Sequence, residues 1–205
     1  MYDIDSQGYQ CLSMDRVEVC SALYYSSLAG MQEVLDCLLH KGESVNVKGG
    51  RHGNALQAAS YEGHEAIAKL LLVNGADVNA KGGIYGNALQ VASFKGYKEI
   101  VKLLLENGAE VNAKEGMYGN ALQAALLRGN EAIAKLLVEN GADMNAKEGK
   151  YGNAPQAASY EGYETIVKLL LEKGAEVNAK GGEYGNALQA ASFRGNEATT
   201  KLLQM

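Results

Sequence analysis

The stretch GNALQAASYEGHEAIAKLLLVNGADVNAK, residues 53–81, decides the fold because most of it returns at a fixed distance along the chain. The pair that begins the stretch marks the period at Gly53-Asn54, Gly86-Asn87, Gly119-Asn120, Gly152-Asn153 and Gly185-Asn186. A repeat of about 33 residues is typical of arrays in which similar supersecondary units stack on one another. The chain of 205 residues has room for six such units.

Each unit is predicted to hold two short helices. Asn54 is a good N-cap residue, and Gln57, three positions later, fits a capping box. We expect the first helix over about 55–62, and Gly63 ends it because glycine readily adopts the left-handed conformation found there. The second helix is expected over about 65–74, before another glycine.

The second helix has an apolar stripe that must be buried. Ile67, Leu70 and Leu71 fall at i, i+3 and i+4, and we predict that they form this stripe. Helices of about nine residues are marginal alone in water. Each helix pair must therefore bury its apolar face against the next pair, so that stacking is obligatory.

A less regular unit precedes these five. Ala22 lies one repeat period before Ala55, and Ser21 stands where the later units have the Asn cap. The repeat domain therefore spans 15–205, and residues 1–14 form a lead segment that we expect to cover the N-terminal end of the array. The six units cover about 15–47, 48–80, 81–113, 114–146, 147–179 and 180–205.

The motifs Asn-Ala-Leu-Gln (54–57), Gly-His (63–64), Ile-Ala-Lys-Leu-Leu-Leu (67–72) and Gly-Ala-Asp-Val-Asn-Ala (75–80) closely resemble the ankyrin repeat. The resemblance implies an all-α ankyrin-repeat solenoid of six stacked helix-turn-helix units with short hairpin-like loops. The family's usual Thr-Pro-Leu-His reads Asn-Ala-Leu-Gln here, where Asn can cap and Gln can replace His as the hydrogen-bonding partner. This version is similar to arrays in fungal proteins that often carry NACHT-type nucleotide-binding domains, although the chain has no Gly-x-x-x-x-Gly-Lys-Ser/Thr motif.

Several positions depart from the repeat. In the first unit, Val34, Cys37 and Leu38 are predicted to fill the buried stripe, with Cys37 as a small core residue. When the units are aligned, each position of the repeat forms a column, and Pro155 occupies a column otherwise filled by Leu. It lies near the second helical position, where a missing N–H is tolerated. In the last unit the polar residues Thr199, Thr200 and Gln204 replace apolar ones. We interpret these three as a cap where the array ends.

Two polar rows run through the units. One row of asparagines is expected to hydrogen-bond the local turn backbone, and the family resemblance implies that such asparagines can be hydroxylated by an oxygenase. These are Asn46, Asn79, Asn112, Asn145 and Asn178. The second row lies at the hairpin base, and we interpret it as a solvated charged edge. It consists of Lys48, Lys81, Lys114, Lys147 and Lys180.

Composition excludes several functional classes. With 47% hydrophobic and 21% charged residues, the chain is not of the disordered class. Its formal charge of −5 argues against a general nucleic-acid binder. The longest apolar runs are far shorter than the roughly 18 residues of a membrane span. The first residues show no secretory signal pattern, and we expect a monomer inside the cell, cytoplasmic rather than nuclear.

The cysteines and histidines carry no recognisable site. The three cysteines, Cys11, Cys20 and Cys37, are an odd number confined to the first unit and lead segment, which favours a reducing compartment. Their spacings of 9 and 17 match no compact zinc pattern. The histidines His40, His52 and His64 lie on different parts of the repeat. We therefore expect no metal site and no cofactor.

Any binding specificity should lie in the columns where the units differ. On the first helix these are an aromatic-rich column and the charged column after it, and in the loop they are the hairpin tip. We predict a partner-binding set consisting of Tyr61, Glu62, Phe94, Lys95, Leu127, Arg128, Tyr160, Glu161, Phe193, Arg194, Arg51, Ile84, Met117, Lys150 and Glu183. A second aromatic row of His52, Tyr85, Tyr118, Tyr151 and Tyr184 is so regular that we expect it to pack between hairpins.

The chain is predicted to be a binding protein and not an enzyme. Catalysis needs different groups that converge on one point, whereas each polar type here recurs along a row. No Gly-x-Ser-x-Gly, His-Glu-x-x-His or dinucleotide motif is present. The leading hypothesis is a scaffold that binds a protein or peptide on its concave face. The alternatives are the ligand-sensing array of a fungal NACHT-type receptor, and an inhibitor or assembly partner of one enzyme.

Overall fold

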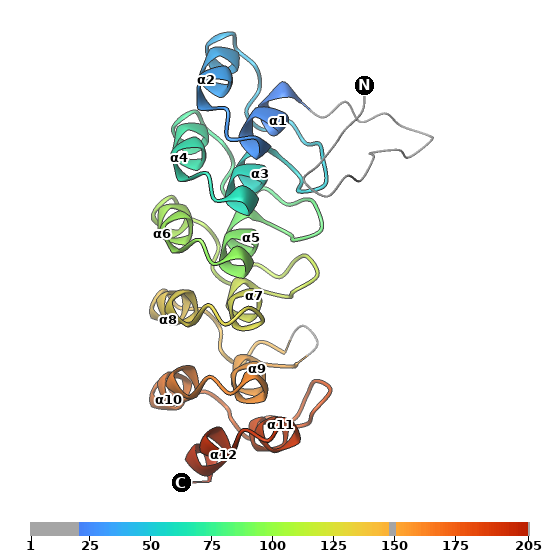
Figure 1. Ribbon diagram of the computed structural model, residues 1–205, viewed down its shortest axis with the longest axis vertical. Coiled ribbons are helices and arrows are strands. Elements are labelled where there is room, and N and C mark those ends of the chain that lie inside the picture. Colours follow the sequence, from blue (N-terminus) through green and yellow to red (C-terminus); the bar gives the residue numbers. More distant parts are fainter. Residues whose placement is uncertain (1–20, 148–150, 205) are drawn as a thin grey trace, which may run out of the picture.

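The computed structural model describes residues 21–147 and 151–204, which form an all-helical solenoid of six stacked helix-turn-helix units. The even-numbered helices stack in one column, the odd-numbered helices stack beside them, and the connecting loops project beyond the odd-numbered column (Figure 1). The lead segment 1–14, Cys11, Cys20 and Lys150 lie outside the described residues. The helices are α1 (Ala22–Leu28), α2 (Gln32–His40), α3 (Ala55–Glu62), α4 (Glu65–Val73), α5 (Ala88–Lys95), α6 (Lys98–Glu106), α7 (Ala121–Leu126), α8 (Glu131–Glu139), α9 (Ala154–Glu161), α10 (Glu164–Glu172), α11 (Ala187–Arg194) and α12 (Glu197–Leu203).

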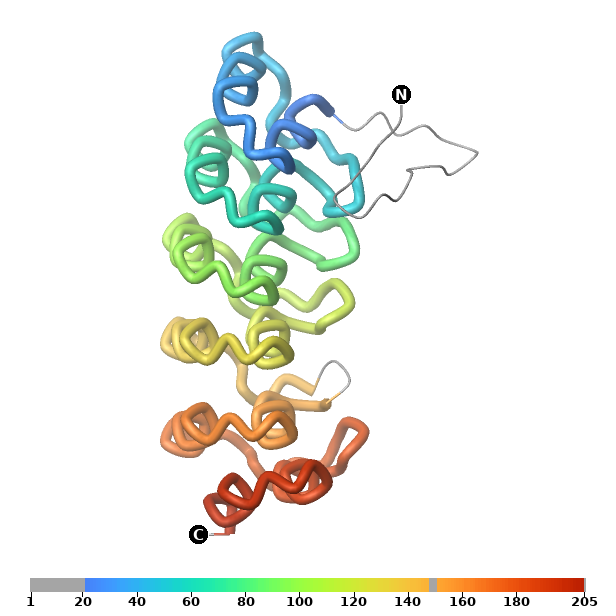
Figure 2. Tube along the Cα trace, in the orientation of Figure 1, coloured from blue at the N-terminus to red at the C-terminus, as the bar shows by residue number. Residues whose placement is uncertain are grey.

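The predicted N-cap and the predicted glycine stop are both confirmed for α3, but the predicted capping box at Gln57 is incomplete because Gln57 Oε1 has no hydrogen-bond partner within the described chain. The Asn54 side chain accepts a hydrogen bond from the Gln57 N–H at 2.9 Å, and Ser21 caps α1 in the same way. Asn87, Asn153 and Asn186 form complete capping boxes. Gly63 ends α3 with φ 83°, a conformation that glycine adopts without the steric cost other residues would carry. In each unit the trace turns back after the first helix to form the second, and the next unit then stacks below (Figure 2).

From the second unit on, a glutamine amide joins one unit to the next, whereas the first unit has Tyr24 at this repeat position. Gln90 Nε2 donates to the carbonyl oxygens of Ala113, Glu115 and Gly119 at 3.2, 2.8 and 2.8 Å. These three oxygens lie at the base of the following hairpin. Gln57 and its counterparts in α7 and α9 bond the following hairpins similarly. Gln therefore fills the hydrogen-bonding role predicted for it, and it fixes each loop against the preceding helix.

The asparagine row does not bond its own turn, and the prediction of a local role was wrong. Asn79 Nδ2 donates to Gly108 O at 3.1 Å, and Asn79 Oδ1 accepts from Glu110 N at 2.8 Å. Both partners belong to the following unit. Asn46 and Asn112 make the same pair of bonds, and among the described residues positive φ angles occur only at glycines. Asn46, Asn79 and Asn112 therefore each link their unit to the next through two side-chain hydrogen bonds.

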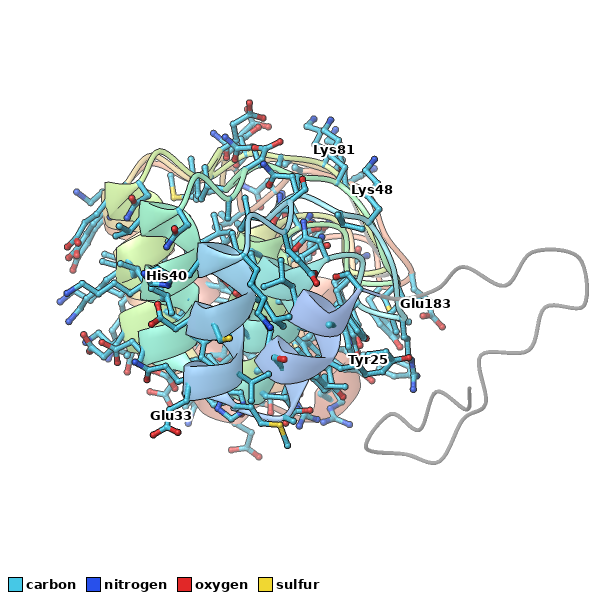
Figure 3. The ribbon with its side chains drawn as sticks, turned by 90° about the horizontal axis from the view of Figure 1, so that it is seen from above. Tyr25, Glu33, His40, Lys48, Lys81 and Glu183 are labelled. Atoms are coloured by element: carbon cyan, nitrogen blue, oxygen red, sulfur yellow. The ribbon has the colours of Figure 1, made fainter. Side chains whose placement is uncertain are left out.

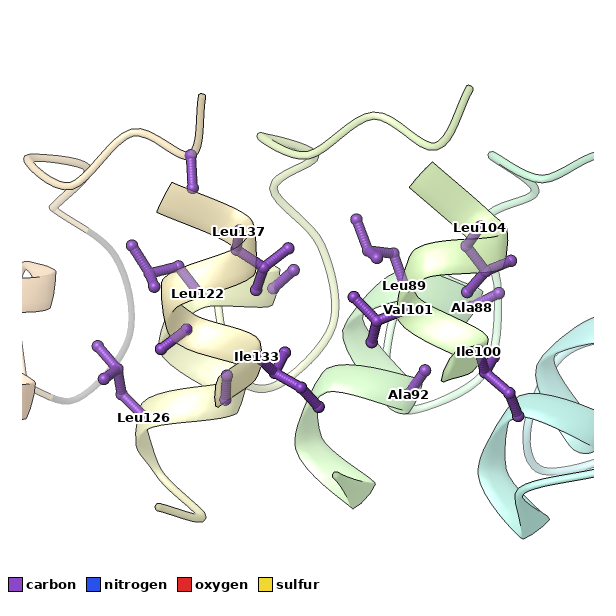
Figure 4. Packing of buried hydrophobic residues seen from close by; sticks show 14 of the residues in the cluster. Ala88, Leu89, Ala92, Ile100, Val101, Leu104, Leu122, Leu126, Ile133 and Leu137 are labelled. Carbon is purple, nitrogen blue, oxygen red and sulfur yellow. The ribbon is translucent and has the colours of Figure 1, made fainter. Parts of the chain in front are cut away.

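The core lies between the two helix columns and is continuous from unit to unit (Figure 4). Leu89, Leu104, Leu122 and Leu137 are at most 1% exposed. In the second unit, α4 buries Ile67, Ala68 and Leu71, while Leu70 is only half-buried. The prediction is therefore confirmed for Ile67 and Leu71, whereas Ala68 takes the buried place predicted for Leu70.

The end units show that the isoleucine column faces the preceding unit. Ile67 is 2% exposed, but Val34, in the same column of the first unit, is 46% exposed. Thr199, in this column of the last unit, is 1% exposed, because α12 still packs against α10. The prediction of Thr199 as part of a polar end cap was therefore wrong, whereas Gln204 is exposed.

Cys37 was also predicted incorrectly. It is exposed and was expected to be a small core residue. Its column faces the preceding unit, since Leu70 in the next unit lines a groove together with Met31 and Val34 of the first unit. A residue in this column of the first described unit has no such neighbour in the described chain.

The glutamine link can be tested with a matched pair. Gln90 and Gln189 both form capping boxes, but the Gln189 amide is exposed and no described hairpin follows it. Gln90→Ala should destabilise the protein by about 2–4 kcal/mol, because it leaves hairpin carbonyls unpaired and opens a cavity. Gln189→Ala should cost under about 1 kcal/mol, the value of a lost cap interaction. Urea unfolding of both variants measures the difference, and equal costs would contradict the link.

Pro155 provides a second test. It lies at the second position of α9, where its missing N–H is tolerated, and it is buried where other units carry a buried Leu. Pro155→Leu should leave the melting temperature unchanged or raise it, because the larger Leu side chain buries more apolar surface in this column. A thermal melt followed by circular dichroism checks this, and a lower melting temperature would show that the ring's rigidity matters more.

Candidate functional site

The two predicted aromatic rows form a single stack. Starting in the second unit, His52 lies 4.0 Å from Tyr61, Tyr61 lies 5.4 Å from Tyr85, and Tyr85 lies 5.9 Å from Phe94, measured between ring centroids. Phe94 then stacks on Tyr118 at 4.2 Å. Hairpin rings and helix rings therefore alternate, where the sequence predicted two separate rows. We call this stack the aromatic ladder.

The ladder resumes in the fifth unit. Tyr160 lies 4.8 Å from Tyr151 and 4.5 Å from Tyr184, and Tyr184 lies 4.9 Å from Phe193. Between the halves, the helix position is held by Leu127, which is half-buried. The ladder comprises His52, Tyr61, Tyr85, Phe94 and Tyr118, followed after Leu127 by Tyr151, Tyr160, Tyr184 and Phe193.

Backbone contacts between hairpin tips set the register of the hairpin rings. Met117 N donates to Ile84 O at 3.1 Å, and Ile84 N donates to Arg51 O at 3.4 Å. Gly83 permits this approach, since a Cβ there would lie 2.3 Å from His52 O and its φ is +62°. The ring that follows each tip is thereby placed beside the first helix of its own unit.

The helix rings are positioned by the next unit. Asn130 Nδ2 donates to Ser93 O and Phe94 O at 2.8 and 3.1 Å, and Asn196 does the same for Ser159 and Tyr160. These bonds satisfy the last carbonyl groups of α5 and α9. The ends of α5 and α9, which carry helix rings of the ladder, are consequently held by the asparagine side chain of the following unit.

Burial along the ladder is uneven. His52 is 3% exposed and Tyr85 is 9% exposed, so these hairpin rings are mainly structural. Tyr61, Phe94 and Tyr160 are half-buried because hairpin rings flank them. Phe193, at the end of the ladder, is 70% exposed. The edges of the helix rings are therefore the part of the ladder that a partner could contact.

Cations of the next unit cover the helix rings. Lys95 Nζ lies 3.9 Å from the centroid of Tyr61, and the Cζ atom of Arg128 lies 5.0 Å from that of Phe94. Arg194 lies over Tyr160 at 4.7 Å. A cation over the face of an aromatic ring is attracted by the ring quadrupole. Each of these three cations is thus held by the preceding unit.

This pairing follows a rule within the chain that the sequence prediction missed. In the units before the two carboxylates, Glu62 and Glu161, the helix ring column holds Leu28 and Leu127. Cations follow aromatic residues and carboxylates follow leucines, in each case one position beyond a full repeat period. The signal was present in the sequence, but only as a correlation between two columns.

The remaining predicted site residues lie along the loop edge. Arg51, Ile84, Met117 and Glu183 are exposed, whereas Lys150 lies outside the described residues. Viewed down the stack, Tyr25 of the first unit and Glu183 of the last lie at the same edge of the molecule (Figure 3). Lys48 and Lys81 lie together at another edge in the same view (Figure 3).

Several hairpin side chains have pKa values that are raised above their ordinary values. Burial raises the pKa of Tyr85 and of Tyr118, and the neighbouring Glu115 carboxylate raises the pKa of Lys81. These shifts move the groups further from neutral pH, whereas a general acid or base needs a pKa near it. Among residues 21–147 and 151–204, no group of three His, Cys, Asp or Glu side chains could hold a metal ion.

Comparison with known proteins identifies the family. A family model described as ankyrin repeats (three copies) matches residues 7–82, 23–115, 58–148, 89–181 and 122–205. The chain belongs to the ankyrin repeat family. The ankyrin repeat domain of human ASB11, a solved crystal structure, is similar with a TM-score of 0.78 and 29% identity, covering 90% of this chain and 82% of that one.

One further comparison and one property of the helices concern this ankyrin repeat protein. A search among curated proteins finds no match. Within the part of the chain that the structure describes, no helix is both long and apolar enough to cross a membrane. Ankyrin repeat domains generally mediate protein–protein interaction, and their fold is typically a non-catalytic scaffold.

The cation–ring pairing can be measured by a double-mutant cycle. Phe94→Leu and Arg128→Gln, made singly and together, should show a coupling of about 0.5–1 kcal/mol in the free energy of unfolding. The matched control is Leu127→Ala with Glu161→Gln, because this pair occupies the same two columns without a ring or a cation. Its coupling should be close to zero, and equal couplings would contradict the pairing.

Proposed function

We propose that this ankyrin repeat protein is a non-catalytic scaffold that binds a protein or peptide on its concave face, formed by the hairpin tips and the ends of the odd-numbered helices. The observation that carries the proposal is the aromatic ladder with its covering charges. Rings held in place by stacking lose little entropy on binding, and aromatic residues and arginine are enriched among interface residues that dominate affinity.

Exposed apolar residues on the same side support the proposal. Met117 is 62% exposed, Phe193 is 70% exposed and Ile84 is 39% exposed. Met117 and Ile84 are neighbouring hairpin tips, and Phe193 is the last rung of the ladder. Large apolar side chains that gather beside charged ones are typical of partner-binding surfaces.

The Gly-Asn-Ala-Leu-Gln repeats favour a second candidate, the ligand-sensing array of a fungal NACHT-type receptor. An inhibitor or assembly partner of one enzyme would use the same surface. The genes beside this one distinguish a sensor from a dedicated partner. In each case we propose an intracellular monomer, cytoplasmic rather than nuclear, that does not bind nucleic acid or a membrane.

Affinity capture from the native cell tests the proposal with two matched variants. The site variant carries Ile84→Ser, Met117→Ser and Phe193→Ser. The control carries Met31→Ser, Val34→Ser and Val73→Ser, which change three comparably exposed apolar residues at α2 and α4, away from the ladder.

The site variant should lose the proteins that the wild type captures, while the control should keep them. Both variants must first melt within a few degrees of the wild type, so that unfolding is not mistaken for lost binding. If the site variant retains its partners and the control loses them, binding lies on the even-numbered helices and the proposal is wrong.

A further inference from the structure

Two cations on the ladder are left without an internal counter-ion. Lys95 and Arg128 belong to adjacent units, and each is held over a ring of the preceding unit. Among the residues that the structure describes, neither makes an ion pair. By contrast, Arg194 pairs with Glu161 at 3.5 Å, and Lys81 pairs with Glu115. Lys95 and Arg128 are therefore positioned charges that remain available to an external anion.

Apolar side chains lie beside these two cations. Ile84 and Met117 stand on hairpin tips that are joined by a backbone hydrogen bond. The next residue along each hairpin is a tyrosine, and both tyrosines contact Phe94, the ring beneath Arg128. A continuous surface thus runs from the apolar tips across the ladder to the cations. We call Ile84, Met117, Phe94, Lys95 and Arg128 the mid-array patch.

The charge around this patch is opposite to that of the whole chain. In the second to fourth units, the tip and helix columns hold the cations Arg51, Lys95 and Arg128 against the single carboxylate Glu62. The whole chain carries a formal charge of −5. A local positive surface on an acidic protein attracts an acidic partner and fixes where that partner docks.

We infer that the mid-array patch binds an extended acidic peptide segment in which an apolar side chain lies between two carboxylates. Equivalent positions in adjacent stacked helices are about 10 Å apart. An extended chain advances about 3.3 Å per residue, so carboxylates three residues apart span Lys95 and Arg128. The apolar side chain meets Ile84 and Met117. This inference rests on the proposed function, since it names the partner of the same surface.

The proposed segment can be found by selection from a phage-displayed library of random twelve-residue peptides on the immobilised full chain. We expect enrichment of Asp or Glu at a spacing of three, with Leu, Ile, Val, Met or Phe between them. The best peptide is then synthesised with a fluorescent label, and its affinity is measured by anisotropy for the wild type and for variants.

Lys95→Glu and Arg128→Glu should each weaken binding of that peptide roughly tenfold, because each replaces attraction with repulsion. The control variants Lys69→Glu and Lys168→Glu make the same charge change at exposed positions on α4 and α10. They should change the affinity less than about twofold, since exposed charges beyond a Debye length are screened. Melting curves of all four variants confirm that they are folded.

The outcomes separate this inference from the proposed function. If the selected peptides are basic or uncharged but Met117→Ser abolishes their binding, the surface binds peptides and the acidic segment is wrong. If single-stranded oligonucleotides compete for the patch as well as the selected peptide does, the patch binds polyanions in general and the inference is overturned. If no peptide is enriched and affinity capture finds no partner, both proposals fail.

Discussion

A buried glutamine amide in each of the second to fifth units sets the position of the hairpin that follows it. The side-chain NH₂ of Gln57, Gln90, Gln123 or Gln156 lies at the end of one unit and donates to backbone carbonyls at the base of the next hairpin. A buried amide without partners costs more than a hydrogen bond gains. The hairpin is therefore confined to the position where its carbonyls meet the amide. The tips, the hairpin rings and finally the aromatic ladder take their positions from it.

The local structure could be predicted from sequence because its causes are local. The Asn cap and the left-handed glycine of α3 lie at the two ends of one helix and act on its own backbone. The fixed repeat period then required the units to stack. These signals predicted the helices and the solenoid, which the structure confirms, whereas the hydrogen-bonding role of the glutamine was implied by the resemblance to the ankyrin repeat.

The direction in which each column faces could not be predicted the same way. Inside a regular array a residue that packs on the preceding unit and one that packs on the following unit are equally buried. Only the end units differ, and there Val34 is exposed while Thr199 is buried. The alternation of hairpin and helix rings was missed for a related reason. Alignment of the units shows which residues share a repeat position, but it does not show how far apart two repeat positions lie in space.

Pairing between units also changes how a surface like this one can encode specificity. Each cation at this helix position lies over the ring of the preceding unit, so replacing the ring alters the environment of the next unit's cation. The variable element is consequently a pair of residues in neighbouring units. At Leu127 and Glu161 both residues of such a pair are changed together. Leu127 stands in place of a ring, and Glu161 in the next unit stands in place of a cation. The carboxylate there pairs with Arg194, which leaves Lys95 and Arg128 as the available cations in the described part of this helix position.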